Sequence, residues 1–122
     1  MDLLEALEEH LEAIRSKDFE RFAATVAQEE MLLVTADGEV IDDGRQFLDL
    51  HRSWFASPEW SIDARLVHAR EFGGVATCVL RLMYRATGDV AAPAEESILS
   101  LVFVERGGRW LLVQDQNTPV RP

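Results

Sequence analysis

The sequence predicts a single α+β domain, with helices in the first half of the chain and a sheet in the second. Before Pro58, most apolar residues recur at the spacing of helix faces. From residue 60 onward they alternate with other residues, which is typical of strands. Two Gly-Gly pairs divide this second half and predict tight hairpin turns. The 122 residues suffice for one core but not for two domains.

Three helices are expected, two of them at the N-terminus. Asp2 is placed to cap the first, whose apolar stripe consists of Leu3, Leu4, Leu7, Leu11 and Ile14. The break at residues 16–18 separates it from a second stripe, formed by Phe19, Phe22, Ala23 and Val26. These two short helices should therefore run antiparallel. A third stripe follows Gly44 and stops before Pro58, and it comprises Phe47, Leu48, Leu50, His51, Trp54 and Phe55.

The strands are expected in two groups. Residues 31–35 and 39–41 predict a short hairpin around Asp37-Gly38. Later come three or four long strands, with bounds near 60–72, 75–87, 96–106 and 109–117. Residues 88–94 form the one long connection between them. Helices first and a meander of strands second indicate helices packed against one face of a bent antiparallel sheet.

The net charge of −10 is concentrated in the N-terminal half. Residues 1–50 hold 14 acidic and 4 basic side chains, whereas residues 51–122 hold 8 of each. This charge argues against nucleic acid or an anionic membrane as partner. No leader or membrane-length apolar segment is expected, and a single cysteine, Cys78, excludes an intrachain disulfide. We therefore expect a cytoplasmic location.

Motifs for phosphate binding, nucleophilic catalysis and zinc binding do not occur in the sequence. The three histidines lie on separate predicted elements, so neither a metal site nor a cofactor is expected. The acidic hairpin resembles a calcium loop only in composition, because glycine and glutamate do not occupy the sixth and twelfth positions. A solvated acidic hairpin is the preferred interpretation.

Strand alternation identifies two candidate site residues, Arg81 and Asp115. An unbroken period of two places Arg81, Met83 and Arg85 on one face of their strand, opposite Leu82 and Tyr84. In the last strand, the same period groups Trp110, Leu112, Gln114 and Gln116 on one face and Leu111, Val113, Asp115 and Asn117 on the other.

Apolar residues on both faces of a strand indicate that both faces are covered, by helices on one side and by the second subunit of a homodimer on the other.

If Arg81 and Asp115 face one pocket, the arginine would neutralise the carboxylate or bind an anionic ligand. The alternative is a structural ion pair within the sheet. An aromatic wall for an apolar ligand would come from Trp54, Trp60, Tyr84 and Phe47. For each of these residues, plain core packing is the alternative.

Four segments in order resemble the SnoaL-like branch of the nuclear transport factor 2-like superfamily, which includes ketosteroid isomerase-like proteins. They are the turn at residues 16–22, Gly44 to Phe47, the Gly-Gly-Arg-Trp of 107–110, and the closing residues 114–119. The chain is also similar to the association domain of calcium/calmodulin-dependent kinase II. The resemblance implies a cone: a curved antiparallel sheet wrapped over three N-terminal helices, with a pocket at the open end and dimerisation through the outer sheet face.

At most positions that match functional residues of these two families, this chain has a different residue type. The oxyanion-hole tyrosine of ketosteroid isomerase falls at His10 and its partner aspartate at Ser100, while its general base falls near Leu33 or Val34. An apolar residue cannot abstract a proton, so steroid-type isomerisation is disfavoured. The pocket arginine of the association domain matches Arg81. A second pocket arginine of that domain is replaced here by Asn117, which leaves binding of a small carboxylate open.

These observations lead to one hypothesis with an alternative. Residues 1–122 would form one SnoaL-like domain that binds a small apolar or weakly anionic molecule through Arg81, Asp115, Asn117, Ser100, Trp54, Trp60 and Tyr84. As an enzyme it would be a cofactor-free isomerase, cyclase or dehydratase, with Asp115 as general acid or base and Arg81 polarising a carbonyl. The alternative is a non-catalytic association or dimerisation domain.

Overall fold

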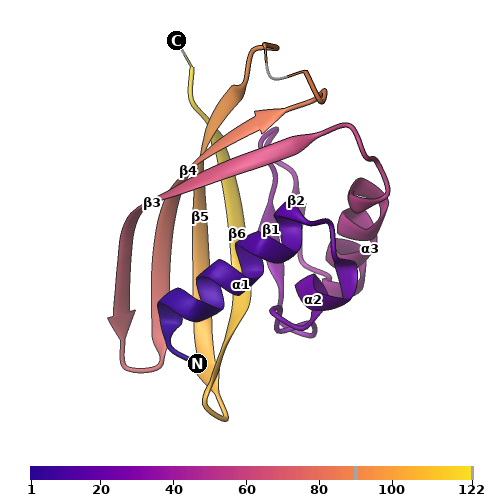
Figure 1. The fold of residues 1–122 in the computed structure, drawn as a ribbon. Coiled ribbons are helices and arrows are strands. Elements are labelled where there is room, and N and C mark those ends of the chain that lie inside the picture. Colours follow the sequence, from indigo (N-terminus) through magenta and orange to yellow (C-terminus); the bar gives the residue numbers. More distant parts are fainter. Residues whose placement is uncertain (90, 122) are drawn as a thin grey trace.

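The computed structural model describes residues 1–89 and 91–121, which form three helices and six strands. In chain order these are α1 (Leu3–Arg15), α2 (Phe19–Ala23), β1 (Leu32–Val34), β2 (Val40–Ile41), α3 (Gly44–Phe55), β3 (Ser61–Phe72), β4 (Val75–Arg85), β5 (Glu95–Arg106) and β6 (Arg109–Pro119) (Figure 1). The predicted α+β class and its order of elements are confirmed. Among the described residues, no helix combines the length and apolar character that crossing a membrane requires.

The helices begin where their capping residues predict. The Asp2 carboxylate accepts a hydrogen bond from the Glu5 backbone N–H at 2.8 Å, and the Glu5 side chain accepts one from the Asp2 N–H at 3.1 Å. This reciprocal capping box fixes the start of α1. Asp43 caps α3 by accepting from the backbone N–H groups of Arg45 and Gln46.

The six strands form one sheet in the order β2-β1-β6-β5-β4-β3. The strands from β3 to β6 make the expected antiparallel meander, and the glycines of both predicted hairpin turns have positive φ, for example 93° at Gly74. The sheet is mixed, however, because β1 pairs parallel to β6. The segment after α2 already runs parallel to β6, because Val26 forms a parallel bridge with Leu112 and the Ala27 N–H donates a hydrogen bond to the Leu112 carbonyl at 2.8 Å. β1 continues in the same direction along β6.

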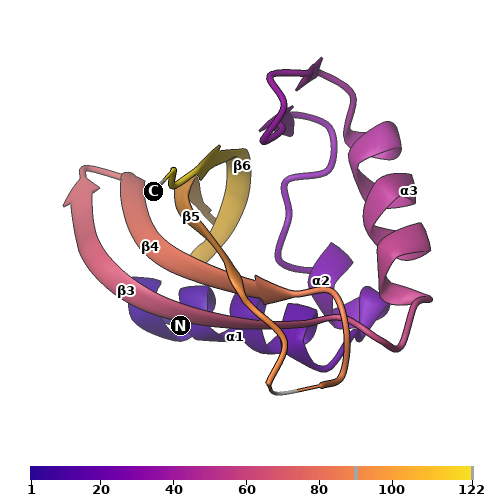
Figure 2. The same ribbon diagram turned by 90° about the horizontal axis from the view of Figure 1, so that it is seen from above.

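The long strands curve, and α1 crosses one face of the sheet while α2 and α3 lie beside it (Figures 1 and 2). This inner face and the helices share one apolar core, whose largest fully buried side chains include Phe22, Phe47, Phe103, Leu80, Leu101 and Leu112. The helices therefore cover only one face of the sheet.

A β-bulge in β6 changes which residues face this core. Val102 pairs with Gln114 but the next residue, Phe103, pairs with Leu112, so Val113 is the extra residue. The inserted residue switches the alternation, and Leu112 therefore faces inward together with Asp115. The predicted grouping of the last strand, based on an unbroken period of two, is wrong for this reason.

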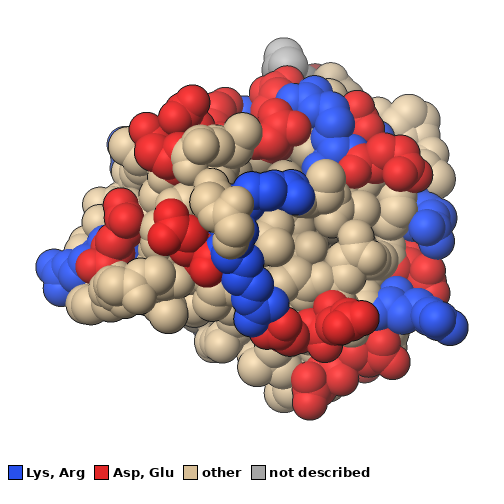
Figure 3. All heavy atoms as spheres, turned by 90° about the horizontal axis from the view of Figure 1, so that it is seen from below, with Lys and Arg blue, Asp and Glu red and all other residues tan. Residues whose placement is uncertain are grey.

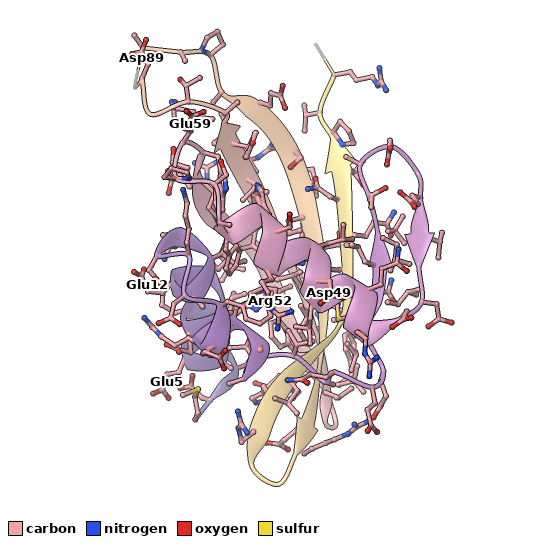
Figure 4. The ribbon with its side chains drawn as sticks, turned by 90° about the vertical axis from the view of Figure 1, so that its right-hand side faces the viewer. Glu5, Glu12, Asp49, Arg52, Glu59 and Asp89 are labelled. Atoms are coloured by element: carbon pink, nitrogen blue, oxygen red, sulfur yellow. The ribbon has the colours of Figure 1, made fainter. Side chains whose placement is uncertain are left out.

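Acidic side chains of the N-terminal half lie on the outside of the helices. Glu5 and Glu12 project from α1, and Asp49 and Arg52 lie on the outer side of α3, where they form an ion pair at 3.0 Å (Figure 4). Seen from below, side chains of both charges ring an uncharged centre (Figure 3). These positions agree with the interpretation of the acidity as a solvated outer surface.

Candidate functional site

The inner face of the sheet, α1 and α3 enclose a cavity of about 190 Å³. Its lining is mostly apolar, with side chains from five elements: Leu11, Ile14, Leu33, Ile62, Leu82 and Leu99. Four polar residues also reach it, namely Thr35, His51, Asp115 and Asn117, together with Trp54 and Ala36. A few polar groups in an apolar hollow are typical of a small-molecule site.

Asp115 and Asn117 enter this cavity because of the bulge that precedes them. Asp115 pairs with Leu101 of β5 on one side and with Leu33 of β1 on the other, and Asn117 pairs with Leu99. Residues two apart on a strand share a face, so both polar side chains are directed inward among these leucines.

Among the described residues, Asp115 is the only acid that lines the cavity. Its side chain is 9% exposed, and it forms no hydrogen bond or ion pair with the residues that the structure describes. Burial without a compensating partner disfavours the charged form and raises the pKa of Asp115 from 3.8 to about 7. Near neutral pH the carboxyl therefore populates both protonation states, as a general acid or base requires.

His51 contributes a neutral ring with one free acceptor. Its Nδ1 lies 2.9 Å from the Phe47 carbonyl, and because a carbonyl only accepts, Nδ1 must carry the proton. Nε2 is then the unprotonated nitrogen. Burial lowers the pKa of His51, which keeps the ring neutral, and the ring stacks on Phe22 with centroids 4.6 Å apart.

The other two polar residues differ in availability. The Thr35 hydroxyl donates to Asp37 and accepts from the Glu39 N–H at 2.9 Å, so the β1–β2 turn already occupies it. Asn117 Oδ1, in contrast, is buried without a hydrogen-bond partner among the described residues. Asn117, like Asp115 and His51, therefore presents a polar group without a partner in the described part of this region.

The predicted aromatic wall is layered. Trp54 lines the cavity, and Trp60 stacks on it with centroids 3.8 Å apart and an interplanar angle of 8°. The Trp60 Nε1–H donates to the Trp54 carbonyl at 2.7 Å, and the Tyr84 ring lies 6.3 Å from that of Trp54. Trp60 and Tyr84 thus support Trp54 from outside the cavity lining, and Phe47 is fully buried in the core.

Arg81 and Ser100 lie on the opposite face of the sheet. Leu80 and Leu82 of β4 face the core, so Arg81 between them points outward, where it forms an ion pair with Glu96 at 2.6 Å. Ser100 pairs with Val79, which lies on that same outer face. The prediction that Arg81 and Asp115 share a pocket is wrong, and so is the alternative ion pair between them.

His10 is buried in the core outside the cavity lining and presents no proton donor to the cavity. The Thr25 hydroxyl donates to the Phe22 carbonyl at 2.6 Å, so it accepts from His10 Nδ1–H at 2.8 Å. Nε2 is left unprotonated, buried and without a partner among the described residues. Burial, with a smaller effect of His51, lowers the pKa of His10 to about 3. The position that matches the tyrosine of ketosteroid isomerase therefore cannot stabilise an oxyanion.

Leu33 lies at or next to the position matched to the general base of ketosteroid isomerase, and a carboxyl group, that of Asp115, lies on the neighbouring strand. Leu33 of β1 and Asp115 of β6 are in register, and neighbouring strands lie roughly 4.8 Å apart. Sequence reasoning treated His51 only as part of a helix stripe. Its position three residues before Trp54, which places both on one side of α3, was the available signal for a shared site.

Of two other hollows on the surface, one is a broad groove and the other contains charged side chains that pair with each other. One of about 240 Å³, beside Trp110, contains Glu9 and Arg21, which pair with each other at 2.7 Å. A broad groove of about 890 Å³ runs along α3, over Asp42, Asp43 and Asp49. Within the described part of the chain, no three His, Cys, Asp or Glu side chains gather as metal ligands.

The fold matches that of solved structures described as nuclear transport factor 2-like or as having a cystatin-like fold. Residues 3–120 match the SnoaL-like domain, and the chain belongs to this family. A comparison with curated protein sequences gives no significant match.

Solved structures share the fold at low sequence identity. A Thiobacillus denitrificans protein, provisionally named a calcium/calmodulin-dependent protein kinase type II association domain, has a TM-score of 0.84 at 12% identity, covering 98% of this chain and 95% of its own. A Streptomyces avermitilis protein, provisionally named a dehydratase of the nuclear transport factor 2-like family, has a TM-score of 0.81 at 18% identity, with 98% and 94% covered. An uncharacterised Caulobacter vibrioides protein with a cystatin-like fold reaches 0.78 at 24%, with 98% and 88% covered.

Proposed function

We propose that this SnoaL-like protein binds a small, largely apolar molecule in its inner cavity, with Asp115 as the polar anchor. The observation that carries the proposal is a carboxyl group nine-tenths buried in an apolar cavity without a partner among the described residues. Burying a polar group without a hydrogen bond costs several kcal/mol, and a ligand that supplies the bond would offset this cost. The cavity holds about six water molecules at roughly 30 Å³ each, which suits a single-ring ligand.

The same carboxyl group supports cofactor-free proton transfer, as in an isomerase, cyclase or dehydratase. As a carboxylate, Asp115 would remove a proton from the carbon next to a ketone, and the electron pair would move onto the carbonyl oxygen. Where that carbon also neighbours a C=C bond, return of the proton from Asp115 to the far carbon of that bond shifts the double bond into conjugation and regenerates the ketone and the carboxylate. With His10 unable to donate, the oxyanion would be weakly stabilised, so we expect a slow reaction.

The binding and catalytic proposals are tested with a compact ketone. In 3-cyclohexen-1-one, proton removal at C2 and return at C4 gives 2-cyclohexen-1-one, whose conjugated absorbance reports the rate. We expect ketone-induced shifts in the NMR resonances of Trp54, His51 and Asn117. Asp115→Asn should lower any catalysed rate by about 100-fold or more. Asp63→Asn, the same change on the outer face of β3, is the control.

Each result has a separate meaning for these proposals. If the ketone binds but is not isomerised, the binding proposal stands and the catalytic proposal fails. Equal rates in Asp115→Asn and Asp63→Asn would remove Asp115 from the chemistry.

A second candidate function, association into a homodimer, is favoured by the outer sheet face. This face carries partly exposed apolar side chains from three neighbouring strands: Val79, Met83, Ile98, Val102, Leu111 and Val113. The helices lie on the other face, so a second copy would cover these residues. Sedimentation at micromolar concentration should show a dimer that Val102→Glu dissociates and Val40→Glu, on exposed β2, does not. A wild-type monomer would contradict this proposal.

The cytoplasmic location is proposed together with these functions. Cys78, the only cysteine, is buried as a free thiol, which suits a reducing compartment.

A further inference from the structure

The polar groups around the cavity are mainly acceptors. The Asp115 carboxylate and Nε2 of His51 both accept hydrogen bonds, and the Thr35 hydroxyl is already occupied by its turn. Asn117 adds the unpartnered Oδ1 together with an amide donor. A ligand that satisfies this set must bring hydrogen-bond donors of its own.

The charges around Asp115 also favour one type of ligand. Its neighbours from α1 (Leu11, Ile14), β3 (Ile62), β4 (Leu82) and β5 (Leu99) are apolar, β1 provides Leu33 and Thr35, and α3 provides the neutral His51. His10, which is buried in the core outside the lining, is neutral above about pH 3. The expected cation, Arg81, lies on the outer face with Glu96. In the part of the chain that the structure describes, no lysine or arginine lines the cavity, so an ionised Asp115 has no counter-ion among the lining residues.

We propose that the cavity recognises a compact primary amine in its ammonium form, with the ammonium group against Asp115 and the apolar body among the leucines and Trp54. This inference rests on the proposed binding function and names its ligand class. An ammonium group brings three donors and a positive charge, and it matches a site of acceptors around one carboxylate. The electron-rich face of an indole such as Trp54 attracts the same cation.

The geometry disfavours the two other ligand classes. A carboxylate ligand would place a second negative charge beside Asp115, and no cation in the described lining would balance it. The proposed amine therefore replaces the weakly anionic ligand expected from the sequence. An alcohol supplies only one donor and no charge. It should therefore bind more weakly than the amine whenever Asp115 is ionised.

Three probes of one size test this inference: benzylamine, benzyl alcohol and benzoate. Their binding is followed by the NMR resonances of Trp54, His51 and Asn117. Because only the ionised carboxylate pairs with ammonium, a pKa of about 7 predicts about 30-fold tighter benzylamine binding at pH 8 than at pH 5.5. Benzyl alcohol should show no such increase, and benzoate should bind most weakly at pH 8.

Asp115→Asn separates the carboxylate from other causes of pH dependence. It should remove both the preference for benzylamine over benzyl alcohol and the increase with pH, while Asp63→Asn should retain both. A pH dependence that persists in Asp115→Asn would assign the effect to another group, such as His51, and overturn the inference.

The outcomes also separate this inference from the binding proposal. If benzyl alcohol shifts the cavity resonances but benzylamine binds no tighter at pH 8, the amine inference falls and the binding proposal stands. Tighter binding of benzoate would have the same consequence. If none of the three probes shifts these resonances at either pH, both proposals fail.

Discussion

Replacing Asp115 with asparagine should stabilise the protein at alkaline pH, although it changes a residue in the candidate site. The unfolded chain holds this carboxyl at a pKa of 3.8, whereas burial raises the folded value to about 7. Between these values the folded state binds the extra proton, so stability must fall as the pH rises. Asparagine keeps the shape of the side chain but never ionises.

The magnitude follows from the difference between the two pKa values. About three pKa units at about 1.4 kcal/mol each give a cost of about 4 kcal/mol for wild type, complete above pH 7. Relaxation and water entry would reduce this figure. We expect Asp115→Asn to raise the free energy of unfolding relative to wild type by about 2–4 kcal/mol more at pH 8 than at pH 3.5.

Urea denaturation at pH 3.5, 5.5 and 8 measures this effect, with Asp63→Asn as the matched control on the exposed outer face. The control should follow the wild-type profile. The reasoning is refuted if Asp115→Asn changes stability by the same amount at all three pH values, because the buried charge would then cost nothing.

Three further predictions follow from the core and the outer face. Protonation of only the unfolded His10 contributes a loss of about 1.4 kcal/mol per pH unit below pH 6.5, and His10→Asn should remove this contribution. The free energy of unfolding of His10→Asn relative to wild type should therefore rise by about 1.4 kcal/mol per unit as the pH falls from 6.5 to 4, and parallel profiles in urea titrations would contradict this. Gly44→Ala should destabilise the protein by about 3 kcal/mol or unfold it, because the added Cβ would lie 1.5 Å from the Gln28 carbonyl oxygen. At Gly88 the added Cβ would meet open space, so Gly88→Ala should leave the melting temperature unchanged. Arg81→Gln should leave benzyl alcohol affinity unaltered in the NMR titration, and a tenfold loss would place Arg81 back in the site.

The sequence predicted the elements well because their signals are local. Asp2 caps α1 through a hydrogen bond to a residue three positions away, and Gly74 forms its turn because it adopts a positive φ. Such capping and turn residues therefore predict helix starts and hairpins without knowledge of the fold. The parallel pairing of β1 with β6 depends instead on contacts between Ala27 and Leu112, which are far apart in the chain.

The candidate site was harder to predict because it depends on which face each strand presents. Asp115, Asn117 and Trp54 were identified by residue type and do line the cavity. Their relation to Arg81 was not predictable from alternation alone, since the bulge at Val113 switches the faces of β6 while β4 alternates without interruption. A single inserted residue therefore decides which polar groups can meet.

His10 and Asp115 contribute opposite pH dependences to the same core. Between pH 3.8 and 6.5 the unfolded state gains a proton at His10, and the folded state holds one at Asp115. Their slopes, each about 1.4 kcal/mol per pH unit, have opposite signs and nearly cancel in wild type. A flat wild-type profile in this range is therefore compatible with two strongly perturbed groups, because each single substitution would expose the slope of the other.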